Sequence, residues 1–218
     1  MSRFSSSRTV GALGVLCLAW VSCPDHACAQ ARAERPDAPA PQTTGTAGSG
    51  LRGEWRRAGQ GFACRVVSPR QLPHDATVAD LLVRACQHIG PLSLGNDAKA
   101  VASILGPPHR TLPQPNGVTA SIYFLGRPGE YPYLVVSIAQ ERVVALQVTG
   151  PVAAKGYDFN HVELGADTGT LIQHFGPAVT LKPSSEKDTD VWTYGPWPFS
   201  FEVKGGRVTS IRISEAGF

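Results

Sequence analysis

Residues 89–107 read IGPLSLGNDAKAVASILGP, and residues 159–177, seventy positions further on, read FNHVELGADTGTLIQHFGP. Five of the 19 aligned positions are identical, whereas average residue usage gives about one identity by chance. A sequence that recurs at a fixed spacing is typical of one structural unit used twice. The identical positions are Leu94, Gly95, Asp97, Gly106 and Pro107 in the first copy and Leu164, Gly165, Asp167, Gly176 and Pro177 in the second.

The identical residues predict the two ends of a short helix in each copy. The aspartate can accept hydrogen bonds from the unpaired N–H groups of a first turn, and the glycine can adopt the left-handed conformation that closes the last turn. The proline that follows cannot continue a helix. Val101 and Leu105, like Leu171 and Phe175, are four residues apart and therefore share one helical face.

Alternating apolar residues follow each helix and predict three antiparallel strands per copy. Gln140-Glu141 and Gly205-Gly206 fit the two-residue turns of hairpins. One such unit is too small to bury its apolar face alone, so two should pack side by side. The expected fold is α+β, with two tandem helix-plus-antiparallel-meander repeats forming a sheet backed by helices on one face. The predicted strands are 120–125, 133–139 and 142–148, then 191–194, 199–204 and 207–213.

A further strand and helix are expected before the first repeat. Residues 62–67 are strand-like. Thr77 and Asp80 fit a capping box, and the apolar stripe that follows runs to Ile89, before the helix stop at Gly90-Pro91.

The N-terminus has the pattern of a secretory signal peptide. Arg3 and Arg8 precede an apolar run over residues 10–21, and Ala27-Cys28-Ala29 fits cleavage after Ala29. The run is shorter than the about 20 apolar residues of a membrane span. We therefore expect a periplasmic or secreted protein with no transmembrane span. A lipid anchor on Cys23 is the alternative, since Val21-Ser22-Cys23 resembles a lipoprotein box.

Cleavage after Ala29 would leave Cys64 and Cys86 out of five cysteines. An even pair in an exported chain predicts a disulfide, and closing a loop of about 22 residues should stabilise the fold by about 3 kcal/mol. The expected organisation is a signal peptide (1–29), a disordered linker (30–50), an N-terminal strand and helix (51–88), repeat 1 (89–148), a connector (149–158) and repeat 2 (159–218).

The charge balance argues against a nucleic-acid partner. Without residues 1–29 the chain has 18 Lys and Arg against 16 Asp and Glu, because the leader holds Arg3, Arg8 and Asp25. Five arginines nevertheless gather between Leu51 and Arg70, with Glu54 as the one acidic residue there. We interpret this segment as a solvated positive edge, and an anion site is the alternative.

Several short motifs together resemble the repeat of the β-lactamase inhibitory proteins and of the SmpA/OmlA small outer-membrane lipoproteins. The resemblance covers residues 71–213 and implies a sheet that grips another protein through its free face or its edge, with no cofactor and no catalysis. It has departures: this chain has two repeats and one possible bridge, placed before the first helix. The motifs are Leu-Gly-x-Asp, the Gly-Pro helix stop, Trp192-x-Tyr194, Phe199-x-Phe201-x-Val203 and Gly206-Arg207-Val208-x-x-Ile211.

The sequence lacks the common catalytic motifs, so we do not expect an enzyme. Asp158 and His161 fit an acid/base pair three residues apart, but a surface ion pair is the preferred interpretation. Cys64, Cys86 and His88 could contribute to a zinc site, although exported cysteines are more often bridged. No metal and no cofactor are expected.

The alternation of the strands predicts which side chains face away from the helices. Tyr123 and Tyr133 are the expected anchors for a partner, with Glu202, Lys204 and Arg212 as orienting charges. In the competing interpretation, the segment 51–70 lies across repeat 1 and buries both tyrosines. The expected function is a non-catalytic periplasmic protein-binding, assembly or inhibitor-like module that engages another envelope protein.

A second class of function is the carriage or sensing of a small apolar ligand. Such a ligand would lie between the sheet and the helices, near Trp192 and Phe201. A cavity there would favour this alternative, and a tightly packed core would exclude it.

Overall fold

A computed structural model describes residues 52–66 and 84–215. The predicted signal peptide, the linker and the capping box at Thr77 lie outside these residues, so export and cleavage stay predictions. Among the residues described, no helix is long and apolar enough to cross a membrane.

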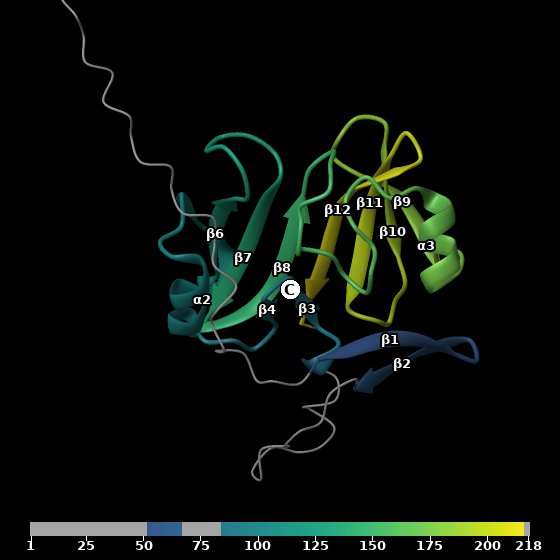
Figure 1. The fold of residues 1–218 in the computed structure, drawn as a ribbon, viewed down its shortest axis with the longest axis horizontal. Helices are drawn as coiled ribbons and strands as arrows, with labels where there is room; N and C mark the ends of the chain where they lie inside the picture. The colour runs from purple at the N-terminus through teal and green to yellow at the C-terminus, as the bar shows by residue number, and fades with distance from the viewer. Residues whose placement is uncertain (1–51, 67–83, 216–218) are drawn as a thin grey trace, which may run out of the picture. The chain divides into compact units, whose positions relative to one another are not determined.

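One antiparallel sheet of eight strands dominates this part of the chain (Figure 1). Its strand order is β5-β6-β7-β8-β12-β11-β10-β9, so β8 and β12 are neighbours in the middle and β5 and β9 form the edges. All six predicted strands are present within a few residues, and the edge strands were missed. The strands are β5 (Arg110–Pro113), β6 (Thr119–Phe124), β7 (Tyr133–Ala139), β8 (Arg142–Thr149), β9 (Thr180–Pro183), β10 (Thr189–Thr193), β11 (Phe199–Lys204) and β12 (Arg207–Ser214).

The two predicted helices form as expected, α2 over Ala98–Leu105 and α3 over Thr168–Phe175. Asp97 Oδ1 accepts a hydrogen bond from the N–H of Ala100 at 2.6 Å, and Asp167 caps α3 in the same way. The residues after the helices are glycines with φ of 73° and 77°, which an L side chain rarely adopts. A short 3₁₀ turn, η1, covers Pro115–Gly117.

The expected α+β architecture with helices backing the sheet is wrong, because the described chain is mostly β. An eight-residue helix is about 12 Å long, whereas eight strands side by side span about 34 Å. Two such helices cannot cover the apolar face of this sheet.

Short irregular segments and a separate two-stranded hairpin also pack against the apolar core of the sheet. The hairpin consists of β1 (Gly53–Ala58) and β2 (Gly61–Val66). A smaller pair, β3 (His88–Ile89) and β4 (Leu92–Ser93), contributes fully buried Ile89 and Leu92. Ile89 was expected at the end of a helix, but the helix has already ended by Cys86. Phe159 and Val162 form a similar bridge before α3 and are also buried.

The two halves of the sheet carry corresponding contacts. Gly95 N–H donates to Val143 O at 2.8 Å, and Gly165 N–H donates to Val208 O at 2.7 Å. Each half contains a register shift, between Ser137 and Ile138 and between Glu202 and Val203. Superposition of the complete repeats remains a prediction.

The predicted disulfide is confirmed. Cys64 on β2 and Cys86 are bridged, with their Cα atoms 5.8 Å apart. Within the described residues β2 pairs with β1 and with no other strand, so the bridge ties the hairpin to the segment that enters β3.

Candidate functional site

Strands β6 and β7 expose an apolar surface on the side of the sheet away from the core. Phe124 opposes Tyr133 and Ile122 opposes Val135 in the register of these strands. Together with β5 and η1 they border a groove of about 580 Å³. We call it the open-face groove. Its lining residues are Arg110, Leu112, Gln114, Pro115, Asn116, Val118, Ala120, Ile122, Phe124, Tyr133, Val135, Ser137, Ala145 and Arg212.

A row of aromatic rings runs along the Tyr133 end of this groove. Tyr131 stacks on Tyr133 with ring centroids 5.4 Å apart, and Phe124 contacts Tyr133 edge-on at 6.3 Å. His109 packs against Phe124 at 5.3 Å. Tyr131 is 58 % exposed, so an anchor-rich surface is available to a partner. Burial raises the pKa of the Tyr133 hydroxyl, with a smaller contribution from Tyr131, so the hydroxyl stays protonated.

The charge of the groove is positive. Its lining contains Arg110 and Arg212 and no carboxylate. Arg212 Nη1 donates a hydrogen bond to Gln147 Oε1 at 3.3 Å, and Gln147 Nε2 donates to Ser210 Oγ at 2.9 Å. This polar network borders the apolar half of the face and favours a ligand that carries a carboxylate.

The structure brings two of the five predicted partner-binding residues into the groove, Tyr133 and Arg212. Glu202 lies in the other half of the sheet and accepts a hydrogen bond from Ser184 Oγ at 2.9 Å. Lys204 is exposed at the end of β11. These two residues do not line the groove.

Tyr123 was expected on the free face, and that expectation is wrong. It lies opposite fully buried Leu134 and is itself 5 % exposed within the core. Strand β6 has large apolar side chains on both faces, so alternation alone could not tell which of Ile122, Tyr123 and Phe124 points inward. The register with β7 places Tyr123 inside.

The competing interpretation, in which the N-terminal segment covers the tyrosines of the first half, does not hold for its described part. The hairpin packs against aromatic residues of the second repeat, which lie in β11, in α3 and between β10 and β11. Trp55 lies 6.0 Å from Phe199 between ring centroids, and Phe62 lies 5.1 Å from Trp197 and 5.8 Å from Phe175.

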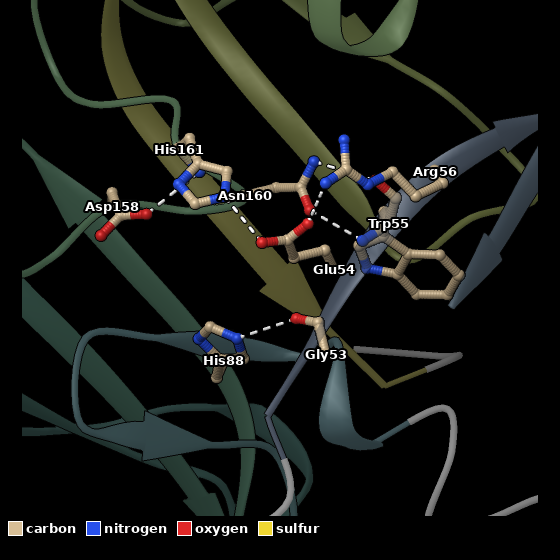
Figure 2. Close-up of polar contacts among 8 residues, drawn as sticks. All are labelled: Gly53, Glu54, Trp55, Arg56, His88, Asp158, Asn160 and His161. Atoms are coloured by element: carbon tan, nitrogen blue, oxygen red, sulfur yellow. Dashed lines mark hydrogen bonds and ion pairs between the residues drawn. The ribbon is translucent and has the colours of Figure 1, made fainter. Parts of the chain in front are cut away.

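A polar cluster holds the hairpin at this position (Figure 2). Asn160 bonds both backbone groups of Trp55: its Oδ1 accepts from the N–H at 2.7 Å, and its Nδ2 donates to the carbonyl at 3.0 Å. His161 Nε2 lies 2.8 Å from Glu54 Oε1, and His88 Nε2 lies 3.2 Å from the carbonyl of Gly53. Arg56, two residues after Glu54 on the same strand, also pairs with Glu54.

The proposed acid/base pair of Asp158 and His161 is not formed through their side chains. Asp158 Oδ2 accepts from the backbone N–H of His161 at 3.0 Å, as in a turn, while the imidazole pairs with Glu54 (Figure 2). Both residues lie in a loop, whereas a shared helical face was assumed. Glu54 is 107 residues away from His161 in the chain, so no local sequence pattern could have predicted this pair.

The environment of the cluster shifts three pKa values downwards. The hydrogen bond from His161 is the largest cause for Glu54, with charge attraction from Arg56 adding to it. Burial is the largest cause of the lowered pKa of His88, and repulsion from Arg52 lowers it further. Burial also lowers the pKa of His174 on α3, with added repulsion from His161. The folded protein therefore favours ionised Glu54 and neutral His88 and His174.

The zinc alternative is not supported by its residues. Cys64 and Cys86 are joined as a disulfide and cannot act as thiolate ligands, and His88 faces Gly53. Over residues 52–66 and 84–215, no group of three or more His, Cys, Asp or Glu side chains is arranged to hold a metal ion.

Side chains fill the place expected for a small apolar ligand. Phe201 is 1 % exposed and packs against Phe175 and Tyr194, with ring centroids 5.3 and 6.0 Å apart. Tyr194 is equally buried, its hydroxyl donates to Gly176 O at 3.1 Å, and burial raises its pKa to about 12.

No family model and no curated protein matches this chain. Solved structures give weak similarities. One is a cysteine-rich secretory protein from Staphylococcus aureus, with 16 % identity, TM-score 0.40 and coverage of 56 % of this chain and 43 % of that one. Another is an extracellular protein containing an SCP domain from Bacillus anthracis, with 13 % identity, TM-score 0.41 and coverage of 69 % and 50 %.

A third similarity is to a provisionally assigned β-lactamase inhibitor protein from Streptococcus mutans. It has 13 % identity and TM-score 0.22, and covers 56 % of this chain and 82 % of that one. The chain spans half or less of the first two proteins. These TM-scores are too low to support a conclusion about function.

Proposed function

We propose that this protein is a non-catalytic binding module that holds an extended, acidic segment of another exported protein in the open-face groove. The observation that carries the proposal is the combination of the aromatic row with two arginines in a groove that has no lining carboxylate. Aromatic anchors supply contact area with few rotors to immobilise, and the guanidinium groups orient a carboxylate.

The edges of the sheet favour binding through the face. An unpaired edge can accept an added strand, but proline there removes a backbone donor. Both edge strands end at a proline, Pro113 in β5 and Pro183 in β9. The proposal therefore assigns recognition to the groove and its side chains.

Location outside the cytoplasm is part of the proposal. The disulfide supports it, because such bridges form and persist mainly in oxidising compartments. The periplasm and a partner in the cell envelope follow from the signal-peptide pattern. The resemblance to the β-lactamase inhibitory proteins rests on the short sequence motifs. If it extends to function, the bound segment would belong to an enzyme that this protein inhibits.

Site-directed photocrosslinking tests this function. A photoreactive phenylalanine analogue at position 133 should crosslink to a protein in an envelope extract from the source cells. Mass spectrometry should place the crosslink in a segment that contains apolar and acidic residues. The same analogue at Val179, which is 65 % exposed and does not line the groove, is the control.

The substitutions Arg110→Gln and Arg212→Gln should each reduce the crosslink from position 133. Equal crosslinking from positions 133 and 179, or no crosslink from either, would contradict the proposal. Capture that is insensitive to both arginine substitutions would contradict the role of charge.

A further inference from the structure

We propose that the pocket between β1 and α3 binds a small molecule through an oxyanion, either a carboxylate or a phosphate. Its volume is about 310 Å³. It shares no lining residue with the open-face groove, so this is a second site. Its lining residues are Trp55, Arg56, Arg57, Asn160, Gln173 and His174.

The side chains of the pocket supply an excess of positive charge. Arg56 and Arg57 line it together with the imidazole of His174, and no carboxylate does. The adjacent Glu54 already pairs with both Arg56 and His161. Among the described residues, Arg57 has no ion-pair partner. A negative ligand would therefore meet a guanidinium whose charge the folded chain leaves uncompensated.

The position of Arg57 depends on the end of α3. A Cβ added at Gly176 would lie 3.0 Å from the guanidinium carbon of Arg57. Gly176 thus provides both the left-handed residue that closes the helix and the space in which the guanidinium lies. The arginines of residues 51–70 were interpreted as a solvated positive edge. Arg56 and Arg57 are exposed, as that interpretation expects, and both also line this pocket.

The wall also contains an unmet hydrogen bond. Trp55 lines the pocket and is 6 % exposed, and its Nε1 has no hydrogen-bond partner among the described residues. Buried donors are normally paired. The indole N–H of Trp55 is therefore a group close to the pocket whose environment a bound oxyanion would change.

Titration followed by nuclear magnetic resonance tests the site on the isotope-labelled, disulfide-bonded protein. Inorganic phosphate and acetate are the two probes, added separately at constant ionic strength. We expect saturable shifts at the Trp55 indole N–H and at the amides of β1 and α3 with at least one probe. Binding of phosphate alone or acetate alone would identify the oxyanion. No saturable shift with either probe would overturn the proposal.

Three variants and one control sharpen the test. Arg57→Gln should weaken binding about tenfold, because it removes a charge-assisted hydrogen bond. His174→Gln should also weaken binding, because an anion in the pocket favours the protonated imidazole and the glutamine amide cannot carry that charge. Glu54→Gln should strengthen binding, since it removes the carboxylate that competes for Arg56. Arg127→Gln removes an equal charge from an exposed residue that lines neither site and should leave the affinity unchanged. Equal weakening by Arg127→Gln would indicate general charge attraction and overturn the site.

Stability is checked separately by circular dichroism of each variant. If Arg57→Gln disturbs the packing over Gly176, the folded His174→Gln variant decides the outcome. Unchanged affinity in that variant would overturn the proposal.

Discussion

Gln147 and Arg212 face each other at the centre of the strand pair that joins the two halves of the sheet. Arg212 pairs with Gln147 in the β8–β12 register, and its guanidinium donates to the amide oxygen at 3.3 Å. On either side Ser210 opposes Thr149 and Ser214 opposes Ala145. The join therefore has a hydrogen-bonded polar surface on the free face and buried Leu146, Val148, Ile211 and Ile213 on the other.

The central position of this strand pair predicts a gradient of protection across the sheet. The amides of Val148 and Ile211 should exchange with solvent most slowly, because both strands are flanked by others and are fully buried there. The amides of β5 and β9 should exchange fastest among the strands. Hydrogen exchange measured by nuclear magnetic resonance checks this order, and edge strands as protected as β8 would contradict it.

The two tyrosines predicted to act alike should differ in their effect on stability. Tyr123→Ala should cost about 3–5 kcal/mol, as truncation of a buried aromatic does. Tyr133→Ala should cost about 1 kcal/mol, because the Tyr133 side chain is only partly buried and lines the groove. Urea denaturation of both variants measures the difference. Equal losses would show that the placement of β6 side chains is wrong.

The side chain of Asn160 should stabilise the hairpin through its two hydrogen bonds to Trp55, beyond the ability of asparagine to adopt a left-handed φ. Asn160→Ala removes both hydrogen bonds to the Trp55 backbone and should cost about 1–3 kcal/mol. Asn116→Ala is a matched control, since both asparagines have left-handed φ, 50° and 60°. Asn116 lies in η1, and its substitution should have the smaller effect. Thermal denaturation compares the two, and equal shifts in Tm would refute the bridging role of Asn160.

Loss of the disulfide should destabilise the fold by about 3 kcal/mol, the value expected for a loop of this length. The sequence separation of the two cysteines is 22 residues. Denaturation of the double variant Cys64→Ala/Cys86→Ala against the oxidised protein measures the effect. Unchanged stability would mean that the hairpin is held entirely by its aromatic and polar contacts.

Acidification should destabilise the fold in two stages. The pKa values of His88 and His174 are lowered on folding, so their contribution is present above about 6.5 and is lost as pH falls towards the folded values. The pKa of Glu54 is also lowered, so its contribution is present above its ordinary value of 4.5 and is lost as pH falls through the folded value. Both effects have the same sign.

Denaturation between pH 8 and pH 3 measures this dependence. His88→Gln should flatten the upper stage, and Glu54→Gln should flatten the lower one. A stability that rises on acidification through the histidine range would contradict the shifts of His88 and His174.

The strands, caps and helix stops were predictable because they depend on local chemistry. Asp97 and Asp167 are suited to capping, Gly106 and Gly176 accept positive φ, and two-residue periodicity marks a strand whatever lies beside it. The disulfide followed from counting, since two cysteines allow a single pairing.

Sequence by itself determined the two capped helices, the six inner strands of the sheet and the pairing of its cysteines. Only the tertiary structure decided which side of β6 faces the core, because one residue of register exchanges the two faces. It also decided that Glu54 pairs with His161 and that Arg57 and His174 line one pocket, since these residues come from segments about a hundred residues apart. Local chemistry carries no information about such neighbours until strands from distant segments share one sheet.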